Sequence, residues 1–174
     1  MPEIDLQALA DRQAITDALY RYGRALDRMD YALALTVWHE DGLADYGEEI
    51  YQGTGHGFID YCFKVHTEMI AHQHLIANII IELDGDAAAS EAYYMSSHRI
   101  LDEGVLKQTM ICGRYLDRWS RRRGRWAIDQ RQSVADYNDI RVVTEFGPIP
   151  RGARDRSDPS YAFLTDRDPA RGAW

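Results

Sequence analysis

The spacing of hydrophobic residues changes near residue 74, and that change limits the fold more than any other feature of the chain. Before it, apolar residues recur at helical spacing over residues 5–28. After it, residues 75–83 are rich in isoleucine and end at the turn sequence Asp84-Gly85-Asp86. Helices followed by a meander of long antiparallel strands are typical of an α+β fold. We therefore expect a curved sheet around the N-terminal helices, enclosing a cone-shaped cavity open at one end.

The boundaries of the expected elements follow from these periods and from the turn residues between them. Asp30 is a suitable N-cap for a second, shorter helix. We expect helices at 5–28, 31–38 and 58–71, a turn at 39–42, a short strand at 43–46, a loop at 47–57, and long strands at 75–83, 87–101, 105–119 and 125–134.

Composition narrows the class of protein. A length of 174 residues is enough for one domain with a substantial core, and a net charge of -8 argues against a nucleic-acid surface. No apolar run approaches the roughly 20 residues that span a bilayer, and the acidic N-terminus lacks the pattern of a secretory signal. Two cysteines predict neither a disulfide framework nor a zinc motif. These features favour a cytoplasmic protein with no membrane partner.

The end of the chain differs from the rest in composition. Residues 147–174 hold four of the five prolines and five arginines, so we expect an irregular tail after a domain formed by residues 1–146. Five apolar side chains in or directly before this region are suited to docking on the body or on a neighbouring subunit, as a lid or a subunit contact: Phe146, Tyr161, Phe163, Leu164 and Trp174. A partly disordered terminus is an equal alternative.

Two polar residues of the first helix are candidates for acid–base chemistry. Tyr22 lies between Leu19 and Leu26 on the apolar face, so its hydroxyl should point inward. Asp27 follows near the helix end, where it can orient an imidazole or accept a proton. Alone, each residue is better explained as a core tyrosine and a capping carboxylate.

His72 and His74 begin the strand region and should share one face by strand alternation. A metal site would need a third ligand, and the sequence places none clearly nearby. A histidine that acts as a general base is the more attractive hypothesis, because its ordinary pKa lies near neutral pH.

The last strand contains Arg131, which alternation places with Ala127 and Asp129 and opposite Trp126 and Ile128. An inward arginine would need a carboxylate or an anionic ligand group. Arg114, Asp117 and Arg118 in the preceding strand present the same choice of faces, which the sequence leaves open.

The order and spacing of several short stretches resemble the SnoaL-like branch of the NTF2-like superfamily, over residues 11 to 137. Those stretches are Tyr20 to Asp27, His74 to Asn78 with Asp84-Gly85-Asp86, Tyr93-Tyr94, His98-Arg99, Gly113 to Arg118, and Gly124 to Ile128. The resemblance implies an α+β cone, no cofactor and no metal.

Two lyase groups of that branch are similar at the acid–base positions. The resemblance to bile-acid 7α-dehydratases implies roles for Tyr22, Asp27 and His74. The resemblance to hexachlorocyclohexane dehydrochlorinases implies a His74–Asp27 dyad with Arg131 aiding the leaving group. Two dehydratase positions depart from the pattern, since its arginine falls near Ala135 and its second acidic residue near Ser97.

A third group in the branch releases formaldehyde from lignin-derived diarylpropanes, and the many tyrosines and long tail are compatible with such a substrate. We therefore expect a cofactor-independent lyase that eliminates water or formaldehyde from a hydroxylated aromatic or polycyclic small molecule. His74 would be the base, Asp27 its orienting partner, Tyr22 a donor to the oxygen, and Arg131 or Arg114 a stabiliser of negative charge.

The expected substrate-binding residues are Tyr46, Asn78, His98 and Arg114. The expected assembly is a homodimer or higher homo-oligomer that forms through the exposed sheet face. The alternatives are an isomerase or cyclase of related fold and a non-catalytic ligand-binding domain.

Overall fold

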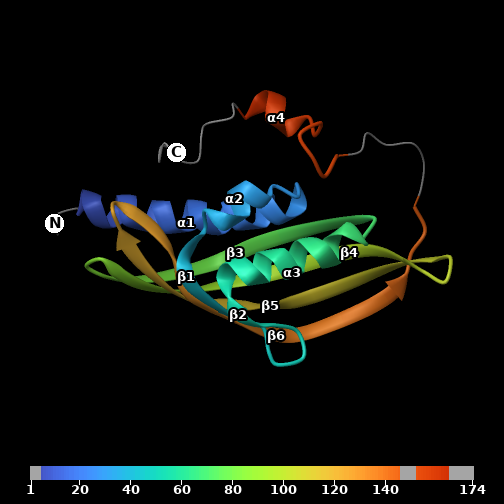
Figure 1. Ribbon diagram of the computed structural model, residues 1–174, viewed down its shortest axis with the longest axis horizontal. Helices are drawn as coiled ribbons and strands as arrows, with labels where there is room; N and C mark the ends of the chain where they lie inside the picture. Colours follow the sequence, from blue (N-terminus) through green and yellow to red (C-terminus); the bar gives the residue numbers. More distant parts are fainter. Residues whose placement is uncertain (1–4, 146–151, 165–174) are drawn as a thin grey trace.

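The computed structural model describes residues 5–145 and 152–164 and confirms the α+β class (Figure 1). Three helices lie on one side of a six-stranded sheet, and a short helix follows in the tail. The elements are α1 Leu6–Asp27, α2 Tyr31–Leu35, β1 Trp38–Asp45, β2 Gln52–Thr54, α3 Gly55–Thr67, β3 Ala71–Asp84, β4 Ala87–Asp102, β5 Val105–Arg122, β6 Arg125–Val142 and α4 Ser160–Phe163. None of the described helices is long and apolar enough to cross a membrane.

Side chains cap the start of each helix in the N-terminal layer. Asp5 accepts from the backbone N–H of Ala8 at the start of α1, and the expected cap Asp30 accepts from Leu33 at the start of α2. Thr54 caps α3 in the same way through Gly57. Each cap satisfies a backbone donor that the first helical turn leaves free.

The sheet has the strand order β2-β1-β6-β5-β4-β3. Strands β3 to β6 form the expected antiparallel meander, and β1 adds to β6 in parallel. The expected turn at residues 39–42 was wrong, because those residues lie inside β1. Position 42 requires a glycine because the strand packs closely there. A Cβ at this position would lie 2.7 Å from the carbonyl oxygen of Ile128. The second helix is correspondingly shorter than expected and ends at Leu35.

A bulge in β6 decides which way Arg131 faces. Trp119 pairs with Ile128 and Arg118 pairs with Gln130, which leaves Asp129 as an extra residue in β6. An extra residue exchanges the two faces of a strand beyond it. Arg131 therefore faces inward with Ile128, and the alternation that placed it on the opposite face was wrong.

The core lies between the inner face of the sheet and the helices. Helix α1 packs on β3 and β6, and α3 packs on β1 and β2. Large side chains from both layers fill this space: Ile15, Leu19, Leu26, Trp38, Ile59, Trp119 and Ile128. The helices thus place the C-terminal end of α1 directly over the start of β3.

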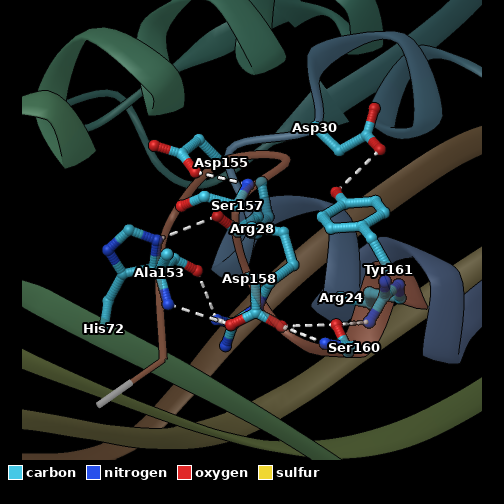
Figure 2. A network of polar contacts seen from close by, with 11 residues as sticks. Arg24, Arg28, Asp30, His72, Ala153, Asp155, Ser157, Asp158, Ser160 and Tyr161 are labelled. Carbon is cyan, nitrogen blue, oxygen red and sulfur yellow. Dashed lines mark hydrogen bonds and ion pairs between the residues drawn. The ribbon is translucent and has the colours of Figure 1, made fainter. Parts of the chain in front are cut away.

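The tail crosses the outside of the helix layer, where Figure 1 shows α4 above α1 and α2. Asp158 anchors it by an ion pair with Arg28 (2.8 Å) and by accepting from the backbone N–H of Ala153 (2.9 Å), as Figure 2 shows. Tyr161 donates to Asp30, whereas Phe163 is 86% exposed. Within residues 152–164, the part of the tail that the structure describes, α4 is the only helix or strand. Of the docking residues expected from sequence, Phe146 and Trp174 lie outside the described residues.

Candidate active site

The first element of the site is an Asp27–His74 pair. Asp27 is the last residue of α1, and its Oδ1 atom lies 2.8 Å from Nδ1 of His74 in β3. The backbone N–H of His74 also donates to both oxygens of the same carboxylate, at 3.0 Å each. The His74 side chain is only 5% exposed.

The contact with Asp27 sets the tautomer of the His74 ring. A carboxylate only accepts, so Nδ1 carries a proton, and in this tautomer the lone pair is on Nε2. The hydroxyl of Ser96 lies 3.2 Å from Nε2 and 2.6 Å from Nε2 of His98. His98 in turn contacts the Thr109 hydroxyl through Nδ1 at 3.1 Å. A hydrogen-bonded chain therefore runs from Asp27 across β3 and β4 to β5.

Two tyrosine hydroxyls form the second element of the site. Tyr22 points inward from α1 as expected, and its hydroxyl lies 2.9 Å from that of Tyr46. The Tyr46 ring stacks on Phe58 with 3.7 Å between centroids. Burial raises the pKa of Tyr22 well above its ordinary value and raises the pKa of Tyr46 to about 12. Both hydroxyls are therefore protonated donors at neutral pH.

Arg131 and Asp117 form the third element, an ion pair with no exposed surface on either side chain. Nε and Nη2 of the guanidinium donate to the two carboxylate oxygens at 2.7 and 2.8 Å. The guanidinium also lies 4.4 Å from the ring centre of Tyr22 and 4.0 Å from that of Tyr115. Burial is the largest single effect and opposes the charge, but Asp117, with Tyr46 and Tyr22, outweighs it and raises the pKa of Arg131 well above its ordinary value. Arg131 is thus a permanent cation beside the tyrosine pair.

Two of the expected substrate-binding residues lie elsewhere. Arg114 faces away from its inward neighbour Tyr115 and pairs with Glu91 and Asp136. Asn78 lies at a bulge in β3 with a φ of 48°, and its side chain is exposed. The structure therefore does not bring these two residues to the group, whereas Tyr46 and His98 belong to it.

Histidines gather next to the Asp27–His74 pair, and one of them was missed from sequence. His66 of α3 lies 4.3 Å from the ring centre of His72, 5.6 Å from that of His74 and 5.7 Å from that of His98. Burial, with repulsion from neighbouring histidines, lowers the pKa of His66 to about 2 and that of His98 to about 4. The available signal was the Cys62–His66 spacing of four residues, which puts both side chains on one helix face.

The SnoaL-like domain family matches residues 7–132. Three solved structures are similar to the chain. A hexachlorocyclohexane dehydrochlorinase of LinA type 3 from Novosphingobium barchaimii is 19% identical, with 84% of this chain and 100% of that chain covered and a TM-score of 0.73. A scytalone dehydratase candidate from Novosphingobium aromaticivorans is 20% identical, with 83% and 97% covered and a TM-score of 0.69. An aromatic ring hydroxylase candidate from Novosphingobium aromaticivorans is 25% identical, with 78% and 94% covered and a TM-score of 0.65. No curated protein sequence matches the chain significantly.

Proposed function

The chain belongs to the SnoaL-like domain family, and from that premise we propose that it is a cofactor-independent lyase acting on a hydroxylated aromatic or polycyclic small molecule. The observation that carries the proposal is the buried Asp27–His74 pair, in which one carboxylate accepts from both the ring and the backbone of one histidine. A histidine held in this way has a fixed tautomer and a stabilised cationic form after it accepts a proton.

In this mechanism Nε2 of His74 takes the proton from the substrate. Asp27 stabilises the imidazolium through the 2.8 Å contact with Nδ1. Ser96 lies on the acceptor side of the ring at 3.2 Å and holds that position until substrate binds. The same residues then return the proton to the leaving oxygen or to solvent.

The Tyr22–Tyr46 pair would stabilise the substrate oxygen that gains negative charge. Tyr22 and Tyr46 keep their protons at neutral pH, so one hydroxyl can donate to the substrate while the other supports it through the 2.9 Å contact. The Arg131 cation favours negative charge near the Tyr22 ring and oxygen, because it lies 4.4 Å from that ring. Asp117 holds the guanidinium in place, so Arg131 acts through its electrostatic field and does not donate a proton.

Two bond cleavages fit this proton transfer. In dehydration, the C–H electron pair forms a C=C bond and the neighbouring C–O bond breaks, so that hydroxide leaves with a proton as water. In formaldehyde release, the primary O–H loses its proton and its electron pair forms the C=O bond of formaldehyde. The C–C pair then becomes a C=C bond as hydroxide leaves, so a diarylpropane diol yields a stilbene, formaldehyde and water. A lignin-derived diarylpropane is our favoured candidate substrate.

The isomerase or cyclase alternative needs a free carboxylate base. Asp27 is the carboxylate in position, but both of its oxygens already accept from His74. This engagement favours the histidine base and therefore the lyase.

The tail is proposed to act as a lid for this site. Arg154 donates to the backbone carbonyl of His66 at 2.7 Å, so the tail is attached to the helix that carries a histidine of the site.

The proposed homo-oligomer would use the outer face of β3 and β4, where Leu75, Tyr93 and Met95 are exposed together.

The proposal is tested by incubating the metal-free protein with diarylpropane diols, hydroxysteroids and related phenols, followed by mass spectrometry. Loss of the mass of water supports dehydration, and loss of water plus formaldehyde, with formaldehyde in the medium, supports C–C cleavage. A product of unchanged mass with a new retention time would overturn the lyase in favour of an isomerase. No reaction across the panel would favour a binding domain.

A further inference from the structure

Four side chains lie together on the inner face of the sheet, near the start of β3 and the end of β4, and three of them are histidines. His72 pairs with His98 across the two strands, and His74 pairs with Ser96. Residues two apart on a strand share a face, so all four point toward the helices. His66 approaches the block from α3 above it, and the ring-centre distances to its three histidine neighbours lie between 4.3 and 5.7 Å.

Three of these rings have nitrogen atoms close enough to share one ion. One ligand nitrogen from each of His66, His74 and His98 lies within 4.8 Å of the other two. Nitrogen ligands of a tetrahedral Zn²⁺ at 2.0–2.1 Å are about 3.4 Å apart, so the site must close by no more than about 1.4 Å. His66 is the ligand contributed by the helix layer, in the last turn of α3, so closure requires its ring to move toward β3 and β4.

The surroundings of the three rings resemble the outer shell of a metal site. Asp27 fixes the proton of His74 on Nδ1 and leaves Nε2 available, which is the carboxylate–histidine arrangement that orients metal-binding imidazoles. Thr109 holds Nδ1 of His98 in a similar way. Cys62 lies one turn before His66 on α3, with Sγ 3.5 Å from Nε2 of His66. That separation matches the sulfur–nitrogen edge of about 3.5 Å in a tetrahedral zinc site.

The charged groups around the three histidines favour a bound cation only in part. Burial lowers the pKa of His66 and of His98, which keeps these two rings in the neutral form that binds metal, and the Asp27 carboxylate lies next to His74. Arg154 of the tail is the opposing cation, because its guanidinium binds the backbone of His66. A single ion of high affinity for imidazole overcomes that repulsion more readily than a hard cation that prefers oxygen ligands.

We propose that His66, His74 and His98 form a binding site for a divalent transition-metal ion of the Zn²⁺ class, with Cys62 next to the open position. The sequence supplied only the His72-x-His74 pair, and the fold brings His66 and His98 to it. An ion on Nε2 of His74 removes the lone pair that the proposed base needs. The site is therefore inhibitory, a consequence that rests on the proposed function, whereas metal binding itself does not.

The test is isothermal titration of the metal-free full-length protein with Zn²⁺, with Mg²⁺ as the hard-cation control. We expect one Zn²⁺ per chain and no Mg²⁺ binding. His66→Gln should weaken Zn²⁺ binding by about tenfold or more, because even loss of an outer-shell partner costs about that much. His56→Gln is the matched control, since His56 is on the same helix ten residues away, roughly 15 Å along the axis, and should bind as the unaltered protein does. Circular dichroism confirms that each variant is folded.

A second measurement keeps the proposal open to refutation if His66→Gln fails to fold. Co²⁺ added to the unaltered protein should give the visible ligand-field bands of a tetrahedral site, and His98→Gln should abolish them. Absence of one-site Zn²⁺ binding, or equal affinity in both ligand variants and the unaltered protein, overturns the proposal. If a substrate is found, Zn²⁺ should inhibit the unaltered protein and not His66→Gln. Zn²⁺ binding without turnover of any compound in the panel would favour the binding domain over the lyase and would leave the metal site supported.

Discussion

The carboxylate of Asp27 accepts from two donors of one residue: the backbone N–H of His74, which is shared between both carboxylate oxygens, and the ring Nδ1 of His74. The end of a helix is thereby fixed to the start of a strand 47 residues later in the chain. The same carboxylate therefore joins α1 to β3 and sets the tautomer of the imidazole. The structural and chemical roles of Asp27 are therefore inseparable, and each variant at this position must be judged on both.

Asp27→Asn should reduce turnover by about 10²- to 10⁴-fold, the usual contribution of a positioned acid–base group. The amide keeps an acceptor for the His74 backbone, but it cannot stabilise the imidazolium. Steady-state kinetics with the substrate found in the mass-spectrometric panel measures the loss. Asp17→Asn, ten residues earlier on α1, is the control and should leave turnover unchanged. Equal activity of Asp27→Asn and the unaltered protein would exclude the dyad.

The pairing of Asp27 with His74 was an expectation from the family resemblance, and the local sequence patterns placed only the two elements that carry the residues. Tyr22 and Asp27 lie on a strongly periodic helix, and His72 and His74 alternate within a regular strand. The long strands were predictable for the same reason, since Asp84-Gly85-Asp86 and Arg123-Gly124 are unambiguous turns.

Features that depend on contacts between distant segments were not predictable. Arg131 faces inward only because Asp129 is an extra residue relative to β5, and nothing in the sequence of β6 alone marks that bulge. Gly42 resembled a turn residue, but it is required where β1 passes the Ile128 carbonyl. His66 joins the site only because the last turn of α3 brings its ring next to the histidines of β3 and β4.

Tyr22→Phe should lower kcat more than it alters KM, because the lost hydroxyl is proposed to act on charge that develops in the transition state. A loss of about 10²-fold or more is expected, as for removal of one donor to a developing oxyanion. Tyr115→Phe is the matched control, since its ring keeps the 4.0 Å contact with Arg131. Equal effects of the two substitutions would argue against a role for the Tyr22 hydroxyl.

The rate constant kcat should not fall at alkaline pH as a result of tyrosine ionisation. Burial raises the pKa of Tyr46 to about 12 and raises that of Tyr22 further from its ordinary value, so both phenols stay protonated. We expect kcat to be independent of tyrosine ionisation past about pH 10, where an exposed tyrosine titrates. Ultraviolet titration at the phenolate wavelength, comparing the unaltered protein with Tyr46→Phe, assigns the late transition. A transition of Tyr46 near its ordinary pKa would contradict the prediction.

Removing one partner of the Arg131–Asp117 pair should strongly destabilise the fold. Both side chains have no exposed surface, so Asp117→Ala leaves an unpaired charge in the core at a cost of about 3–5 kcal/mol. The double variant Arg131→Met with Asp117→Leu should lose less stability than Asp117→Ala, because no buried charge remains. Urea unfolding gives the free energies. Lys107→Ala, which removes a partly exposed ion pair with Asp102, should cost no more than about 1 kcal/mol.

Asp158→Ala should release the tail from the body. Asp158 accepts from Ser160, from the backbone of Ala153 and from Arg28, whereas the nearby control Asp155 accepts from Ser157 within the tail. Hydrogen–deuterium exchange of residues 152–164 should therefore increase in Asp158→Ala and change little in Asp155→Ala.

Acidification provides an independent test of the same anchor. The hydrogen bonds from Ser160 and Ala153, with the Arg28 cation, hold the folded pKa of Asp158 below its ordinary value. A carboxyl group with a lowered folded pKa contributes stability that is fully present above its unfolded pKa of about 3.9 and is lost as the pH falls through the folded value. Exchange of residues 152–164, corrected for the intrinsic rate, should therefore be the same at pH 7 and pH 5. Release of the tail between these two values would show that a different group holds it, and the lid proposal would then lose its anchor.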